Sequence, residues 1–193
     1  MIIKDFNKKL DIMIKDAKCE LNYNRDYELV IATVLSAQCT DKRVNEVTKV
    51  LFGNYDIYGL ANADKKDIER IIRSCGSYTK KSGYIIDIAK SLVENYNGVV
   101  PNDREYLESL PGVGRKTANV VLLNAFNKCE GIAIDTHAKR ISNRTGLSQN
   151  DDPLKIGQYL SGYHIVGGVG TIVNNAEKYK IDTIIFAIPT CSI

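Results

Sequence analysis

One short segment in the middle of the chain most constrains its fold. Asp103 is a typical N-cap for a helix that runs to Leu110. Residues 111–114, with the sequence PGVG, form a tight connection, and a second helix runs from Arg115 to Phe126. Glycine permits positive φ, and the second helix begins with unpaired N–H groups, so this hairpin is able to bind phosphate through its backbone. Without its context, the same pattern is more often a plain connection between two helices.

The rest of the chain has helical periodicity up to about residue 150. Residues 27–38 are apolar nearly all round, which indicates a central buried helix, although their β-branched side chains also fit a strand. Thr40 or Asp41 is expected to cap the next helix, and Gly76 and Gly98 to end later ones. Besides the hairpin and residues 27–38, helices are expected over residues 2–18, 41–51, 65–75 and 80–94.

Composition sets broad limits on the class of protein. The chain has 193 residues, of which 44% are hydrophobic and 25% are charged. These values are typical of a globular protein and exclude disordered, collagen-like and coiled-coil classes. The length fits one domain or two small lobes. The net charge of +3 permits contact with nucleic acid but does not argue for it.

The N-terminal segment and the cysteines indicate the cellular compartment in which the protein is expected. The first 18 residues alternate apolar and charged side chains, which excludes a signal peptide or a membrane span there. We therefore expect a cytoplasmic protein that makes no membrane contact. The five cysteines form no CxxC pair and no clustered metal site, so we expect reduced thiols and no bound metal. They are Cys19, Cys39, Cys75, Cys129 and Cys191.

Lys116 is a candidate nucleophile. Arg115 and Lys116 lie in the first turn of the second hairpin helix, where the helix dipole disfavours cations, and this placement suggests a functional reason. An amine attacks only when it is neutral, and both the dipole and Arg115 favour the neutral form. The residues alone leave two alternatives comparable: a Schiff-base nucleophile, or a point charge that contacts phosphate.

Asp135 is the second candidate. It follows an apolar segment and precedes a helix that runs through Arg140 and Arg144. An N-cap role would explain it fully. An N-cap carboxylate is also held ionised, and such a group is able to stabilise a positively charged sugar or to orient a nucleophile. The two roles are compatible.

Three motifs together resemble a known family. They are LSAQCTD at residues 35–41, LPGVGRKTANVVL at residues 110–122 and IDTHAKRISNRTGL at residues 134–147. In this order they strongly resemble endonuclease III, a bifunctional DNA glycosylase and abasic-site lyase of the helix-hairpin-helix superfamily. The resemblance covers about residues 1–147.

The resemblance implies an all-α fold of two lobes, with DNA bound across the cleft between them. One lobe would be a six-helix barrel over residues 20–130 that contains the helix-hairpin-helix at residues 103–127. The other would combine residues 1–19 with residues 131–193. The implied protein is a monomer that acts on damaged double-stranded DNA.

The resemblance also implies a reaction. Lys116 would attack C1′ of an oxidised pyrimidine nucleotide, and Asp135 would assist it. Loss of the base would leave a Schiff base, and β-elimination would then cut the strand 3′ to the lesion. Related adenine glycosylases lack a lysine at the position of Lys116, so its presence favours the bifunctional enzyme.

The same resemblance assigns DNA contacts. To reach C1′ the enzyme flips the nucleotide out of the stack, and Gln38 would fill the hole. A second wedge would come from residues 76–78, where the family usually has leucine but this chain has Ser77, which cannot supply an apolar wedge. Tyr78 beside it is able to stack on a base. Lys80 and Lys81 would contact phosphate, unless they only belong to a solvated loop. The predicted DNA-binding residues are Gln38, Tyr78, Lys81, Gly112, Val113, Gly114, Arg115, Thr117, His137 and Arg140.

The C-terminal region departs from the family. Endonuclease III normally ends with four cysteines, spaced C-x6-C-x2-C-x5-C, that hold a [4Fe–4S] cluster, and this chain has no such array. We therefore predict no cluster and no other cofactor. Residues 162–170 are rich in glycine, and the residues after them read as strand-like runs. This ending, atypical after about residue 150, fits a frameshifted or truncated gene, or a natural replacement by other packing.

Three functional hypotheses follow. The first is an active base-excision glycosylase and lyase. The second is an inactive truncated paralogue that keeps the motifs but folds poorly. The third is a non-enzymatic helix-hairpin-helix protein that binds DNA without chemistry. Strand cleavage that depends on Lys116 separates the first from the other two.

Overall fold

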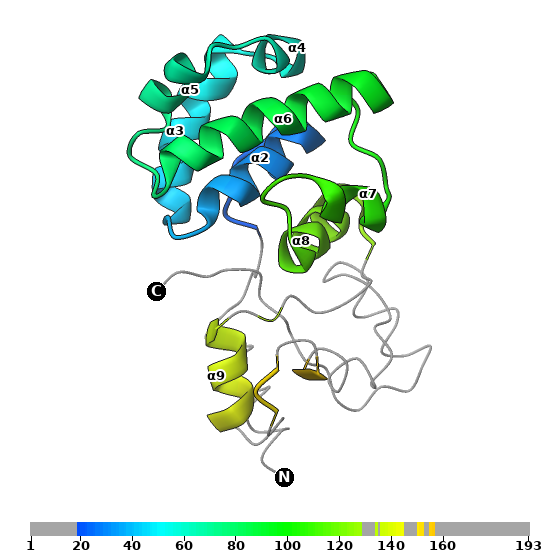
Figure 1. Ribbon diagram of the computed structural model, residues 1–193. Coiled ribbons are helices and arrows are strands. Elements are labelled where there is room, and N and C mark those ends of the chain that lie inside the picture. The colour runs from blue at the N-terminus through cyan, green and yellow to red at the C-terminus, as the bar shows by residue number, and fades with distance from the viewer. Residues whose placement is uncertain (1–18, 129–133, 135, 145–149, 153–154, 157–193) are drawn as a thin grey trace. The chain divides into compact units, whose positions relative to one another are not determined.

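Every regular element among the described residues is an α-helix, which confirms the predicted all-α class for that part of the chain (Figure 1). The computed structural model describes residues 19–128, 134, 136–144, 150–152 and 155–156. In chain order the helices are α2 (Asp26–Ser36), α3 (Asp41–Asn54), α4 (Ile57–Ala61), α5 (Lys65–Ile71), α6 (Tyr78–Tyr96), α7 (Arg104–Ser109), α8 (Arg115–Phe126) and α9 (Thr136–Arg144).

The chain divides into two compact units. One comprises Glu20–Phe126 with Ser192–Ile193, and it contains helices α2 to α8. The other comprises Met1–Cys19 with Asn127–Cys191, and α9 belongs to it. The helix expected over residues 2–18 and the strand-like runs near the C-terminus lie outside the described residues.

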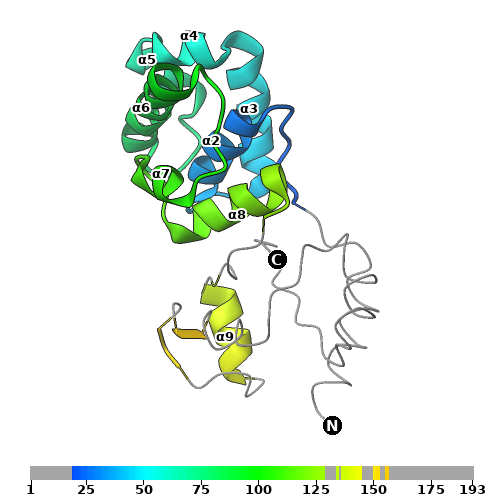
Figure 2. The same cartoon turned by 90° about the vertical axis from the view of Figure 1, so that its right-hand side faces the viewer.

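Helix α2 forms the centre of its unit. It contacts α3, α6 and α8, and it lies between α6 and α3 in Figure 2. Leu29, Ile31 and Leu35 are 0% exposed, as are their neighbours Val30 and Ala32. Because α2 carries apolar side chains on all of its faces, each face is able to pack against another element. The prediction of a central helix is confirmed, and the strand alternative is wrong.

Local caps decide where the next helices begin. Thr40 is the N-cap of α3, and its side chain accepts a hydrogen bond from the Arg43 N–H. Asp41 is therefore the first helical residue rather than the cap. Asp56 and Asp64 cap α4 and α5 in the same way. Helix α4 was not predicted, because five residues are too few to show a helical period.

The expected helix over residues 65–75 is shorter than predicted. Helix α5 ends at Ile71, and the Cys75 N–H donates to the Ile72 carbonyl in a turn. Gly76 therefore does not end this helix, and that prediction is wrong. Helix α6 begins two residues earlier than predicted, ends at Tyr96 and is capped by Asn97. Gly98 follows with φ +80°, and its N–H donates to the Leu92 carbonyl, as expected for a glycine at a helix end.

Candidate active site

The hairpin between α7 and α8 is the core of the candidate site. Asp103 caps α7 by accepting hydrogen bonds from the N–H groups of Glu105 and Tyr106, as predicted. Gly112 has φ +77°, and a Cβ atom at that position would lie 2.7 Å from Cδ2 of Tyr84 in α6. Real Cβ atoms do not approach so closely, so this position requires glycine.

Gly114 and Val113 have surroundings that differ from those of Gly112. A Cβ at Gly114 would have no neighbour within 4 Å, so the backbone there borders open space. Val113 is 5% exposed, and its N–H donates to the Leu110 carbonyl at 3.1 Å. The Val113 N–H is thus engaged inside the hairpin, whereas Gly114 leaves room for a ligand. The Gly114 carbonyl accepts from the Ala118 N–H and so starts α8.

Lys116 shares an electrostatic environment with a buried carboxyl group. Lys116 is the second residue of α8 and is half-buried, whereas Arg115 before it is exposed. Asp41 is only 4% exposed. Burial and the neighbouring Glu20 carboxylate raise the pKa of Asp41, and the positive charge of Lys116 opposes this rise. The fold therefore places a buried carboxyl group within electrostatic reach of the candidate nucleophile.

Asp41 was not among the site residues predicted from the sequence. An aspartate before an apolar helix pattern is typical of an N-cap, and only that role was expected for it. The sequence feature that could have indicated a site role for Asp41 is its place at the end of the LSAQCTD motif. Its electrostatic contact with Lys116 depends on how α3 and α8 each pack against α2, which no local pattern reveals.

The two predicted wedge segments are adjacent. Gln38 is exposed, with φ +57°, in the loop after α2, and Ser77 is exposed, with φ +58°, in the loop before α6. A Cβ at Gly76 would lie 3.3 Å from the Gln38 carbonyl oxygen, so the loops pack backbone to backbone. Tyr78 is half-buried as the first residue of α6. The structure thus brings Gln38 and residues 76–78 together at one place.

Lys81 is placed differently from the expectation. It is 5% exposed, and its Nζ donates to the Leu35 carbonyl at 2.9 Å and to the Ala37 carbonyl at 2.6 Å. Burial lowers its pKa. An ammonium group held by the last carbonyls of α2 stabilises that helix end. This placement argues against a direct phosphate contact for Lys81, whereas the neighbouring Lys80 is exposed.

Residues 31–163, more than half of the chain, match the family described as "HhH-GPD superfamily base excision DNA repair protein". The chain belongs to this superfamily. Within the HhH-GPD superfamily, it is similar to endonuclease III of Synechocystis sp., with 48% identity over 72% of this chain and 64% of the relative. It is also similar to endonuclease III of Rickettsia conorii, with 43% identity over 76% of this chain and 71% of the relative.

A solved structure supports the same assignment. A trapped endonuclease III–DNA covalent intermediate matches with a TM-score of 0.77 and 43% identity, over 83% of this chain and 76% of the other. The chain spans about two thirds of the length of the curated relatives it matches. These findings confirm the resemblance drawn from the three motifs, and they place the chain in the endonuclease III family.

The third family motif lies in the other unit. Helix α9 begins at Thr136, directly after Asp135, and carries His137 and an exposed Arg140. Asp135 itself lies outside the described residues, so its cap role and its part in the reaction stay predictions. Lys139 forms an ion pair with Asp151 at 3.0 Å in the same unit.

The cysteines within the described part of the chain do not form a cluster site. An iron–sulfur cluster needs four thiolates in one place. Cys39 and Cys75 are adjacent, and Cys129 and Cys191 lie outside the described residues. Among the residues that the structure describes, no group of three or more His, Cys, Asp or Glu side chains could hold a metal ion. No described helix is long and apolar enough to cross a membrane.

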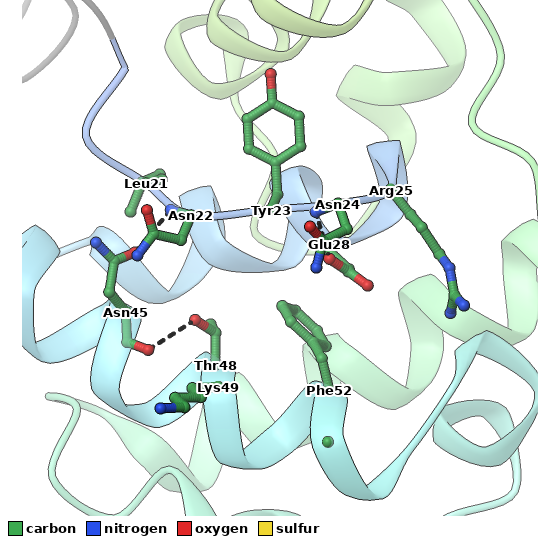
Figure 3. Close-up of a pocket in the computed structure, with 11 residues that line it drawn as sticks. Leu21, Asn22, Tyr23, Asn24, Arg25, Glu28, Asn45, Thr48, Lys49 and Phe52 are labelled. Atoms are coloured by element: carbon green, nitrogen blue, oxygen red, sulfur yellow. Dashed lines mark hydrogen bonds between the residues drawn. The ribbon is translucent and has the colours of Figure 1, made fainter.

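A cavity of about 690 Å³ lies elsewhere in the larger unit. Figure 3 shows the segment 21–25 on one side of it and α3 on the other. The Asn22 N–H donates to Asn45 Oδ1, and the Asn24 N–H donates to the buried carboxylate of Glu28. None of the predicted site residues lines this cavity. Its polar groups bind one another and hold the segment 21–25 against α2 and α3.

Proposed function

We propose that this chain is a bifunctional DNA glycosylase and abasic-site lyase that removes oxidised pyrimidines from double-stranded DNA. The observation that carries the proposal is the half-buried Lys116 amine, at the start of α8 and beside a hairpin whose backbone is open at Gly114. A nucleophilic amine next to a phosphate-binding backbone is what attack on a DNA sugar requires.

In the proposed reaction the neutral Lys116 amine attacks C1′ and the C1′–base bond breaks. The base leaves with a proton, the sugar ring opens, and C1′ becomes a protonated imine of the Lys116 nitrogen. Loss of a C2′ proton then expels the 3′ phosphate. Water finally hydrolyses the imine and regenerates the amine. Each step needs a proton to be moved, and carboxyl groups near the amine are suited to this.

Two carboxyl groups are candidates for supporting this reaction. Asp41 is buried within electrostatic reach of Lys116. Asp135, which precedes the first residue of α9 in the sequence, is the carboxylate that the family resemblance assigns. We propose that Asp135 stabilises the positive charge that develops on the sugar as the base departs. Asp41 would act through Lys116, by setting the electrostatic environment of its amine.

The proposed DNA surface combines the hairpin with the two adjacent loops. The backbone around Gly114, together with Arg115 and Thr117, would bind phosphate. Gln38 would fill the space left by the flipped nucleotide. Ser77 replaces the usual apolar wedge, so Tyr78 would stack on the base opposite. Val113 would hold the hairpin from inside, and His137 and Arg140 of α9 would contact phosphate.

The wider setting of this activity is also a proposal. The partner would be damaged duplex DNA, and the chain would act as a monomer in the cytoplasm, at the nucleoid. No cofactor enters the proposed reaction, because Lys116 and the two carboxyl groups supply all of its chemistry.

Strand cleavage tests the proposal. Duplexes with one thymine glycol, one abasic site or no lesion would be incubated with the wild-type chain, Lys116→Ala and Lys90→Ala. Lys90 is an exposed lysine of α6 and serves as the matched control. We expect the wild type and Lys90→Ala to cleave both damaged duplexes and Lys116→Ala to cleave neither. Binding without cleavage by the wild type would instead identify a non-enzymatic DNA-binding protein.

A further inference from the structure

Two cysteines that are 36 positions apart in sequence lie in contact. The Cys39 Sγ is 3.8 Å from the Cys75 Sγ, and the Cys39 thiol donates to the Cys75 sulfur. Both are free thiols; Cys39 is half-buried and Cys75 is 1% exposed. Cys39 follows the end of α2 and Cys75 precedes α6, so the pair forms only through the packing of these two helices.

The cysteine pair lies at the base of the two wedge loops. Cys39 directly follows Gln38, and Cys75 is two residues before Ser77. Both Gln38 and Ser77 have a left-handed backbone, which is uncommon outside glycine and indicates that the surrounding packing fixes each loop. Near the pair, Lys81 ties α6 to the end of α2 through its two carbonyl contacts.

We propose that Cys39 and Cys75 are a redox pair, which hydrogen peroxide converts into a reversible disulfide that joins the Gln38 loop to the Ser77 loop. The disulfide itself follows from the contact between the two sulfur atoms. Its effect on DNA cleavage rests on the proposed function.

The difference in exposure between the two thiols indicates which of them reacts with peroxide first. Cys39 is the accessible thiol, so its thiolate attacks peroxide, takes one oxygen atom and releases hydroxide, which leaves a sulfenic acid. The Cys75 sulfur then attacks the Cys39 sulfur, the S–S bond forms, and the Cys39 oxygen departs as water. Overall the two thiols lose two protons and two electrons, and peroxide is reduced to two water molecules.

The surroundings of Cys75 suit the second step. Burial raises the pKa of Cys75 to about 11, and the charge and hydrogen bond of Cys39 contribute to the rise. The positive charges of Lys81 and Arg43 oppose this rise in pKa and so favour the Cys75 thiolate that attacks Cys39.

A disulfide would change the geometry of the loops. An S–S bond is about 2.05 Å long, so the two sulfur atoms must come about 1.8 Å closer than the 3.8 Å that now separates them. The bond would draw the two loops together and displace Gln38 and Ser77 from the positions that the reduced protein gives them. Displacements of about 1 Å near a reacting centre reduce rates by up to about 100-fold, so we expect at least a tenfold slower cleavage.

The test measures the bond and the activity separately. The full chain would be treated with hydrogen peroxide, its remaining thiols blocked, and its peptides mapped by mass spectrometry. Cleavage of a thymine glycol duplex would be timed before oxidation, after it, and after reduction with dithiothreitol. Cys39→Ser and Cys75→Ala each remove one partner, and Cys19→Ser serves as the control that retains both.

We expect a Cys39–Cys75 linked peptide that is lighter by two hydrogen atoms than the two free peptides. Oxidation should slow cleavage at least tenfold in the wild type and Cys19→Ser, with recovery after reduction. Within Cys39→Ser and within Cys75→Ala the rates with and without peroxide should agree. Using both variants guards against misfolding of one of them.

Two results would overturn the inference. One is oxidation of Cys39 to sulfinic acid with no linkage to Cys75. The other is a linked pair with an unchanged rate of cleavage. Absence of cleavage in the reduced wild type would count against the proposed function alone, because the linked peptide is detected without DNA.

Discussion

The ring of Tyr84 lies directly against the backbone of Gly112, which leaves no room for a side chain at the tip of the hairpin. The same glycine has φ +77°, so steric contact and backbone conformation both require it. Helix α6 therefore supports the hairpin through one aromatic ring. The position of α8, and with it of Lys116, depends on this contact.

Gly112→Ala should lower the free energy of unfolding by about 1–3 kcal/mol, the usual range for a non-glycine residue in a strained backbone conformation. Urea denaturation measures the change. Gly114→Ala is the matched control, because a Cβ there would meet nothing within 4 Å. Its stability should stay close to that of the wild type. Equal stability of the two variants would contradict the assigned role of Tyr84.

Lys81→Met should destabilise the chain by about 1–2 kcal/mol. Methionine keeps the apolar stem of the side chain but leaves the Leu35 and Ala37 carbonyls without their donor. Lys80→Met changes the exposed neighbour in the same helix turn and should shift stability by less than about 0.5 kcal/mol. Urea denaturation of both variants provides the comparison. Destabilisation of Lys80→Met alone would contradict the finding that Lys81, rather than Lys80, holds the end of α2.

The titration of Asp41 should report the charge of Lys116. Because burial and Glu20 raise the pKa of Asp41, its midpoint should lie above 3.8 in an NMR titration of the side-chain carboxyl carbon. Lys116→Met should raise that midpoint further, and Glu20→Gln should lower it. Lys49→Met, a change at an exposed lysine of α3, serves as the control. An unchanged midpoint in Lys116→Met would show that the two groups are not coupled.

The same pKa determines how stability varies with pH. The folded-state pKa of Asp41 is raised, so the folded state binds its proton more tightly than the unfolded state does. The resulting stabilisation is fully present below about pH 3.8 and is lost as the pH rises through the folded-state pKa. Wild-type stability should therefore fall relative to Asp41→Asn across this window. Parallel pH curves for the two proteins, measured by urea denaturation, would contradict this.

Much of the hairpin could be predicted because its signals are local. The Asp103 cap, the glycines of PGVG and the start of α8 each follow from residues within a few positions of one another. The central helix α2 was predicted from its continuous apolar residues, although its β-branched side chains left a strand as an alternative. Short elements were harder: α4 has five residues, and α5 ends in turns that no glycine or proline marks.

The parts of the site that were not predicted depend on tertiary contacts. Lys81 reads as a surface lysine in sequence, and only the packing of α6 on α2 shows that its amine is buried. The contact between Cys39 and Cys75 and the coupling of Asp41 to Lys116 join residues far apart in the chain. Periodicity and capping rules describe one element at a time, so they do not contain these pairings.

The most direct test of the central claim is borohydride trapping. The wild type, Lys116→Ala and Asp135→Asn would each be incubated with a thymine glycol duplex in the presence of sodium borohydride, which reduces a Schiff base to a stable amine. We predict a covalent protein–DNA adduct for the wild type, linked through Lys116, and no adduct for Lys116→Ala. Asp135→Asn should give much less adduct than the wild type. An undiminished adduct in Lys116→Ala, or none with folded wild-type protein, would contradict the proposed mechanism.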